Sequence, residues 1–191
     1  MATPQQTPAY ALEIRRTFAA LREKVFAAWA QREQLEQWMC KDVPSHKVIH
    51  LEQDIRSGGR YRMEVRDPQK GETYMGRGVY REVQPPERIV FTWSWTKLNP
   101  GGAPTQLHPA SPETQVTVEF FARGNSTDVV LTHALFHTTK DRDDHNQGWN
   151  GCFDVLAQML HTTEHSKLRR TSGHMNSTNP SAAQCKLAAA R

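Results

Sequence analysis

The sequence predicts an α+β fold in which a curved antiparallel sheet wraps around a long C-terminal helix, with two short helices after the first strand. Several segments alternate between apolar and polar residues, a pattern typical of antiparallel strands with one face toward water. Their order is one strand, two short helices, a run of strands and one long amphipathic helix. That helix must bury its apolar stripe, and the sheet offers the large apolar face on which it can do so.

The N-terminal elements are predicted from the spacing of apolar residues, which alternates in the first segment and follows a helical repeat in the next two. The segment 11–18, ALEIRRTF, alternates and predicts the first strand. The segments 20–29 and 32–39 each place apolar residues on one side of a helix, so two short helices are expected there. The residues on their apolar faces are Leu21, Val25, Trp29, Leu35, Trp38 and Met39.

Five or six strands are predicted after the short helices. The segment 60–67, RYRMEVRD, is the cleanest, because Tyr61, Met63 and Val65 alternate with charged residues. The preceding pair Gly58-Gly59 predicts a tight turn. The predicted strands lie at 47–55, 60–67, 73–83, 89–96, 114–122 and 127–136.

A long helix is predicted from residue 138 to about residue 160. Thr138 and Asp141 have the spacing of a capping box, and Asp143 and Asp144 lie early in the helix, where its dipole favours acidic side chains. The apolar stripe recurs at i, i+4, i+7 and i+11. It consists of Trp149, Phe153, Leu156 and Leu160.

The domain organisation follows from composition. We expect one domain over residues 11–161, a disordered segment at 1–10 and a disordered tail at 162–191, which is polar and lacks a sustained period. The end of the tail, KLAAA, resembles a translated cloning-vector polylinker. The segment 97–113, rich in proline and glycine, is expected to be a long loop and a candidate lid over a cavity.

Charge and motifs exclude several classes of function. Of the 24 basic and 20 acidic residues, five basic and one acidic lie in residues 161–191, which leaves 19 of each elsewhere and argues against nucleic-acid binding. No apolar run is long enough to cross a bilayer and no signal peptide is evident, so we expect a cytoplasmic protein without membrane insertion. The three cysteines show no metal-binding or disulfide spacing, and no cofactor or catalytic motif is recognised.

Seven segments spread over roughly residues 11–160 form a recognisable set. In chain order they are LREKVFAAW, LEQW, DIRSGGRYR, GVYREVQPPERIVFTWSW, TQVTVEF, VVLTHALF and HNQGW. Together they resemble the START-like (SRPBCC) superfamily with its helix-grip fold and, more narrowly, the branch related to the C-terminal domain of activators of the heat-shock chaperone ATPase. The sequence departs from the family pattern at Ala30-Gln31-Arg32, where a Ser/Thr-Asp-Pro-like cap is usual, and at Trp38-Met39-Cys40, where paired tryptophans are frequent.

The resemblance implies a mostly apolar cavity between the sheet and the long helix. Bulky aromatic side chains in such numbers rarely fill a small interior without voids, and such residues also line ligand pockets. Each of them individually is more often a plain core residue. We therefore predict a ligand-binding set in which Trp93 and Trp95 form cavity wall. The set is Trp38, Tyr61, Met63, Trp93, Trp95, Val118, Phe120, Leu131, His133, Trp149 and Phe153.

His133 lies on the apolar face of its predicted strand and has two interpretations. The simpler one is a hydrogen-bonded core histidine, kept neutral by burial. The alternative makes it a polar anchor for a ligand or a general acid or base. His145 lies one helical turn before Trp149 and is expected near the cavity mouth, but a His133–His145 metal pair lacks a carboxylate ligand and is not predicted.

Three functions remain open at this point. The first is binding of a small hydrophobic molecule by a monomer or homodimer. The second is a protein-interaction module similar to the chaperone ATPase activators, which would require an exposed apolar patch. The third is a cyclase or hydrolase acting on a polyketide-like or aromatic substrate. Catalytic residues are not assigned, because the inward-facing polar set offers little beyond His133 and Tyr61.

Overall fold

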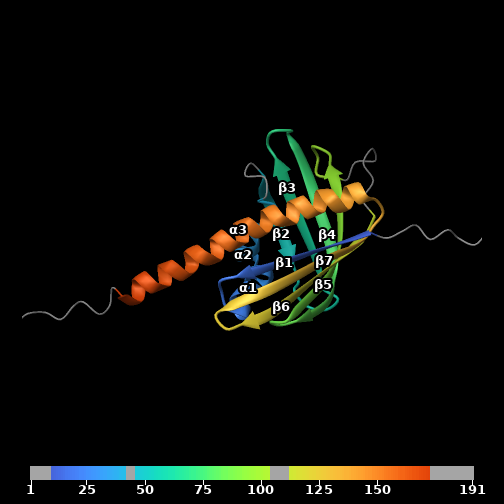
Figure 1. The fold of residues 1–191 in the computed structure, drawn as a ribbon. Helices are drawn as coiled ribbons and strands as arrows, with labels where there is room; N and C mark the ends of the chain where they lie inside the picture. Colours follow the sequence, from blue (N-terminus) through green and yellow to red (C-terminus); the bar gives the residue numbers. More distant parts are fainter. Residues whose placement is uncertain (1–9, 42–45, 104–111, 173–191) are drawn as a thin grey trace, which may run out of the picture.

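The structure, a computed structural model, describes residues 10–41, 46–103 and 112–172, with side chains described as far as residue 162. One seven-stranded antiparallel sheet has the strand order β1-β7-β6-β5-β4-β3-β2 and curves around helix α3 (Figure 1). This confirms the predicted fold class. The elements are β1 (Tyr10–Phe18), α1 (Arg22–Ala30), α2 (Arg32–Trp38), β2 (Lys47–Gln53), β3 (Arg60–Asp67), β4 (Glu72–Gln84), β5 (Arg88–Leu98), β6 (Thr114–Arg123), β7 (Ser126–Phe136) and α3 (Thr139–Ser172).

Helix α3 crosses the concave face of the sheet and projects beyond it at its C-terminal end (Figure 1). At its start, the backbone N–H of Asp141 donates to the hydroxyl of Thr138 at 3.1 Å, as the predicted cap requires. The helix continues past residue 161, the predicted end of the domain, to Ser172. Of the segments predicted to be disordered, 1–10 and 162–191, residues 1–9 and 173–191 lie outside the described part of the chain.

The middle of the loop proposed as a lid, predicted at 97–113, falls outside the described residues. Strand β5 continues to Leu98, and residues 99–103 form a turn in which the N–H of Asn99 donates to the carbonyl of Ala103 at 2.7 Å. Residues 104–111 lie outside the described part of the chain. The lid therefore stays a prediction.

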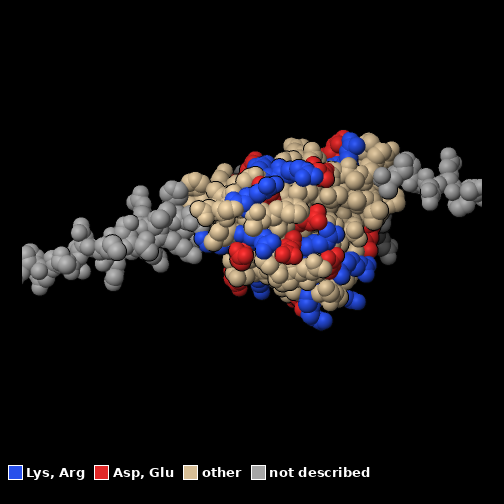
Figure 2. All heavy atoms as spheres, turned by 60° about the horizontal axis from the view of Figure 1, so that its bottom comes forward, with Lys and Arg blue, Asp and Glu red and all other residues tan. Residues whose placement is uncertain are grey.

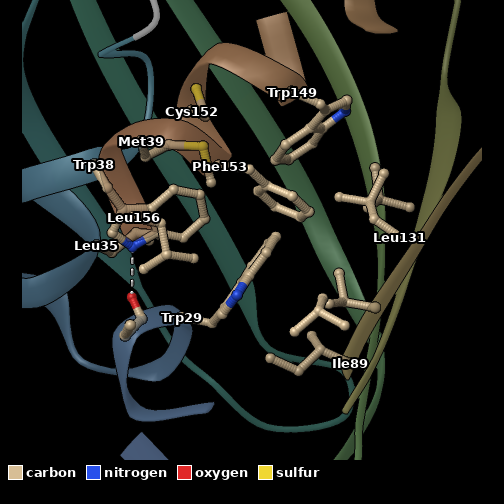
Figure 3. Packing of buried hydrophobic residues seen from close by; sticks show 14 of the residues in the cluster. Trp29, Leu35, Trp38, Met39, Ile89, Leu131, Trp149, Cys152, Phe153 and Leu156 are labelled. Atoms are coloured by element: carbon tan, nitrogen blue, oxygen red, sulfur yellow. Dashed lines mark hydrogen bonds between the residues drawn. The ribbon is translucent and has the colours of Figure 1, made fainter. Parts of the chain in front are cut away.

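Trp29 of α1 lies at the centre of the core between the sheet and α3 (Figure 3). Its ring stacks on Trp149 of α3, with the ring centroids 5.9 Å apart, and meets the edge of Trp38 at 4.7 Å. The indole N–H of Trp38 donates to the carbonyl of Ala28 at 2.9 Å, which ties α2 to α1. Aromatic pairs contribute about 1 kcal/mol each beyond the burial of their area, so this cluster fixes both short helices against α3.

Two glycines on β4 make room for large rings from the neighbouring strands. A Cβ atom on Gly76 would lie 3.0 Å from the ring of Trp95, and one on Gly78 would lie 2.6 Å from the ring of Tyr61 and 1.9 Å from the carbonyl oxygen of Thr92. The Tyr61 ring thus crosses β4 at Gly78, and its hydroxyl donates to that carbonyl at 2.9 Å. The pattern Gly-Arg-Gly in a strand marks close approach of this kind.

The outward face of β5 differs from the sequence expectation. Thr92 and Ser94, expected on a water-facing surface with Arg60, Arg62 and Glu64, are 4% and 9% exposed. The reason for Ser94 is that longer side chains of the neighbouring strands surround it, among them Arg62 and Arg77, which line the same hollow of the outer face. The Thr92 hydroxyl also accepts the N–H of Val79 at 3.0 Å, which pairs it with the chain rather than with water.

The surface carries charges of both signs. On the face shown in Figure 2, basic and acidic side chains are interspersed, in agreement with the balanced composition of residues 1–160. Within the described part of the chain, no helix is both long and apolar enough to span a membrane.

Candidate ligand-binding cavity

A cavity of about 270 Å³ lies between the N-terminal half of α3, the C-terminal end of α2 and strands β3 to β5. Its apolar wall, the part made of large apolar side chains and one thiol, consists of Met39, Val65, Trp93, Trp95, Trp149 and Cys152. Its rim, whose residues are all half-buried or exposed, consists of Cys40, His46, Tyr74, Asp144, His145 and Gly148.

Three tryptophans dominate the apolar wall. The ring centroids of Trp93 and Trp95 are 5.3 Å apart at an interplanar angle of 77°, and those of Trp93 and Trp149 are 5.3 Å apart at 45°. The rings therefore touch one another and form a continuous wall rather than an enclosing cage. Gly76 supports this arrangement, since its missing side chain leaves the space that the Trp95 ring fills. Such a wall suits flat apolar molecules.

A second, inner cavity of about 30 Å³ lies deeper against the sheet. Its volume matches that of a single water molecule. Trp93 and Met39 line both cavities, so they form the partition between them. Trp29 and Gln53 line only the inner one, where the Gln53 amide nitrogen donates to the carbonyl of Ala30 at 2.9 Å.

His133 lies behind the wall in a closed chain of hydrogen bonds. The indole N–H of Trp149 donates to its Nδ1 at 3.1 Å, so the ring proton is on Nε2. That Nε2–H donates to the hydroxyl of Thr114 at 2.7 Å, and the hydroxyl donates to the carbonyl of Trp93 at 3.0 Å. Burial, and secondarily the charge of His145, lower the pKa of His133 to about 3. Both ring nitrogens are therefore hydrogen-bonded within the buried core, as the simpler interpretation of this histidine expects, and a contact of His133 with a ligand stays a prediction.

Each of the two rim histidines contacts an oxygen atom of a residue that does not line the cavity. His145 donates from Nδ1 to the carbonyl of Asp141 at 2.7 Å, and its other ring nitrogen, Nε2, takes no part in this bond. Nε2 of His46 lies 3.5 Å from a carboxylate oxygen of Asp67. Burial acts to raise the pKa of Asp67, but the backbone N–H groups of Lys70 and Gln69 and the contact with His46 outweigh it, so this pKa lies below its ordinary value.

Tyr74 adds a third oriented polar group to the rim. Its hydroxyl donates to the carboxylate of Glu72, which also binds Lys97. The hydrogen bond to Glu72, together with burial, raises the pKa of Tyr74 to about 12, so the phenol stays protonated at neutral pH. Among the described residues, no group of three or more potential ligands could hold a metal ion.

The predicted ligand-binding residues divide into three groups. Trp93, Trp95 and Trp149 line the main cavity. Tyr61 and Met63 line the inner cavity together with Trp93. The remaining residues belong to the closed core and line neither cavity, although the rings of Trp38 and Phe153 contact those of cavity-lining tryptophans. They are Trp38, Val118, Phe120, Leu131, His133 and Phe153. Contact of any of these residues with a ligand stays a prediction.

Sequence reasoning missed most of the rim. Three of its residues come from separate elements that no shared motif connects. Cys40 follows the end of α2, His46 precedes β2 and Tyr74 lies in β4. Two residues of α3 could have been predicted near the cavity from their distance to the stripe residue Trp149. Gly148 lies one residue before it and Cys152 lies three residues after it. His145 was expected near the cavity mouth, and the structure places it on the rim.

The fold and the cavity position define the class of protein. A curved antiparallel sheet gripping a long C-terminal helix, with a cavity between them, is the helix-grip arrangement of the START-like (SRPBCC) proteins. A sequence model of the family "Activator of Hsp90 ATPase homolog 1-like protein" matches residues 19–161. The chain belongs to this family.

Solved structures with the same fold include three bacterial proteins. An AHSA1 protein from Silicibacter pomeroyi has 22% identity and a TM-score of 0.68, over 81% of this chain and 99% of its own. An uncharacterised protein from Rhizobium leguminosarum has 23% identity and a TM-score of 0.67, over 81% and 96%. A protein from Mycobacterium smegmatis has 20% identity and a TM-score of 0.62, over 78% and 90%. No curated protein gave a significant match.

Proposed function

We propose that the protein binds a small hydrophobic molecule in the cavity between α3 and the sheet, and that it does so in the cytoplasm. The observation that supports this most is the continuous wall of three tryptophans along one side of a cavity of about 270 Å³. Ligand sites are typically lined by aromatic and apolar residues with a few oriented polar groups, and the rim supplies those groups through His46, Tyr74 and His145.

The size of the cavity limits the ligand. An apolar cavity of roughly 150 Å³ accommodates benzene, so about 270 Å³ suits a molecule of about two fused rings. Such a molecule would bury its apolar surface against Trp93, Trp95 and Trp149, and each buried Å² contributes roughly 25 cal/mol. Shape and ring stacking would then select flat molecules over branched ones of equal volume.

The proposal is tested by filling the cavity from the helix. Gly148 lies on α3 at the rim, so Gly148→Leu places an isobutyl group into the space the ligand needs. Isothermal titration calorimetry with 2-naphthol should show one saturable site in the unchanged protein and at least 10-fold weaker binding in this variant. Its stability should not fall, because leucine is the better helix former by about 0.8 kcal/mol.

Gln147→Leu is the matched control. It adds the same side chain at an exposed position of the same helix, outside the cavity. Binding of 2-naphthol should be unchanged in this variant. Equal loss in the two variants, or no saturable binding to the unchanged protein, would refute the proposal.

The family match favours a second candidate, a protein-interaction module of the chaperone ATPase activator kind. Four large apolar side chains of the described surface are exposed: Leu21, Ile49, Phe121 and Leu135. They come from the start of α1 and from strands β2, β6 and β7. This candidate predicts a stimulated chaperone ATPase rate on addition of the protein, and it requires no ligand in the cavity.

A further inference from the structure

A hollow of about 720 Å³ lies on the outer face of the sheet, over strands β2 to β5. Three arginines line it, Arg60 and Arg62 of β3 and Arg77 of β4. Arg62 and Arg77 are directly opposite one another in the register of the two strands, and Arg60 is the diagonal neighbour of Arg77. Long side chains at such positions reach one another. A single group on a ligand can therefore contact the guanidinium groups of this cluster.

Arg60 and Arg77 differ from the other arginines whose side chains the structure describes. Each of those others makes an ion pair or a side-chain hydrogen bond, whereas Arg60 and Arg77 make neither within the described part of the chain. Arg62, between them, donates from Nε to the carboxylate of Glu64 at 3.1 Å. Like charges at neighbouring positions of a sheet repel one another. The two arginines without a partner thus share one hollow, where a bound anion would remove this repulsion.

The two acidic side chains that line the hollow contact other basic groups. A carboxylate oxygen of Glu113 lies 3.6 Å from a guanidinium nitrogen of Arg81, and one of Glu52 lies 3.1 Å from Nε2 of His50. Neither carboxylate forms an ion pair with the two arginines that lack a partner. The N–H donors of these arginines are therefore available to a ligand, and a concave surface concentrates their field on it.

We propose that this hollow binds the phosphate group of a small organic phosphate through the guanidinium groups of Arg60 and Arg77. A guanidinium group presents a fork of N–H donors that matches two phosphate oxygens. Two such groups also match the charge of a phosphomonoester, which is about −1.5 to −2 at pH 7. Ser94, the register partner of Arg77 on β5, lines the same hollow and offers a hydroxyl donor.

The volume of the hollow indicates that the ligand has an organic part besides its phosphate. A volume of about 720 Å³ falls within the range of pockets that hold drug-sized molecules. Among the described residues, the hollow shares no lining residue with the main cavity beneath α3. The inference therefore goes beyond the proposed function and does not depend on it.

The first test is a titration of the unchanged protein with phenyl phosphate, followed in ¹H–¹⁵N correlation spectra of the arginine side chains. The Nε–H signals of Arg60 and Arg77 should shift saturably. Phenyl sulfate has a similar shape and one negative charge fewer, so it should bind roughly 5- to 10-fold more weakly. Equal affinities for the two compounds would overturn the assignment to a phosphate.

The second test compares two variants that remove the same charge. Arg77→Gln removes one guanidinium group from the hollow, so the affinity for phenyl phosphate should fall roughly 10-fold. Arg15→Gln is the control, because Arg15 is an exposed arginine of β1 that contacts Glu13 and does not line the hollow. Its affinity should stay within about 2-fold of the unchanged protein, since salt screens a distant surface charge.

Two outcomes would overturn the inference. An equal fall in Arg77→Gln and Arg15→Gln would show that net charge, and not the hollow, attracts the phosphate. Absence of saturable shifts in the unchanged protein would show that the hollow binds no phosphate. Neither outcome affects the proposed ligand of the cavity beneath α3, which binds on the other face of the sheet.

Discussion

Acidification should destabilise the protein through His133. The folded state holds this ring neutral with a pKa of about 3, whereas the ordinary histidine pKa is 6.5. Its folded pKa is depressed, so its contribution is fully present above pH 6.5 and is lost as the pH falls toward 3. At pH 4.5, two units below the ordinary value, the unfolded state gains about 3 kcal/mol relative to the folded state, at roughly 1.4 kcal/mol per pH unit.

The assay is urea unfolding between pH 7.5 and pH 4.5, with His133→Gln as the comparison. Glutamine keeps an amide in place of the ring but does not titrate. The variant should be less stable at pH 7.5 by about 1–2 kcal/mol, because one or more hydrogen bonds of the chain from Trp149 to Thr114 are lost. It should then lose about 3 kcal/mol less than the unchanged protein on acidification.

Carboxylates such as Asp67 and Asp128, whose pKa values are lowered, also lose their contributions on acidification. They are common to both proteins and cancel in the difference. Parallel loss of stability in the two proteins between pH 7.5 and pH 4.5 would refute the assignment of a neutral, buried His133.

Two further predictions concern the packing of the sheet. Gly78→Ala should destabilise the fold by about 3 kcal/mol or more, since its Cβ would lie 1.9 Å from the carbonyl oxygen of Thr92; Gly101→Ala, where no atom lies within 4 Å, should change thermal unfolding little. Thr114→Val should cost about 2 kcal/mol in urea unfolding because it leaves Nε2–H of His133 unpaired, whereas Thr114→Ser should cost under about 1 kcal/mol; equal costs would contradict the hydroxyl's role.

Much of the fold follows from periodicity alone. Alternation in segments such as 60–67 and the stripe through Trp149 and Phe153 require only that apolar side chains leave water, so they predict the sheet, the long helix and their contact. The same alternation assigns each residue to a face but does not report how exposed that face is. Thr92 and Ser94 are buried by contacts with the neighbouring strands, with the backbone N–H of Val79 and with long side chains such as Arg77, and a local pattern does not contain which strands are neighbours.

The cavity was predicted less completely than the fold. Trp93 and Trp95 could be placed on its wall because alternation fixes their face. Cavity shape, in contrast, depends on where α2 ends and how α3 tilts, so the residues at Cys40 and His46 could not be connected with the site from the sequence. The two glycines of β4 could have indicated close packing from the sequence alone, because a glycine inside a strand often marks a place where another group comes close to the backbone. Gly76 and Gly78 indeed accommodate the rings of Trp95 and Tyr61.

The central claim, that a small hydrophobic molecule occupies the cavity between α3 and the sheet, is tested most directly by the indole N–H signals. The chain has five tryptophans, which give five such signals in a ¹H–¹⁵N correlation spectrum. On titration with 2-naphthol, the signals of Trp93, Trp95 and Trp149 should shift saturably, while that of Trp38, which lines neither cavity, should stay in place. Uniform small shifts of all five signals, or none, would contradict the claim.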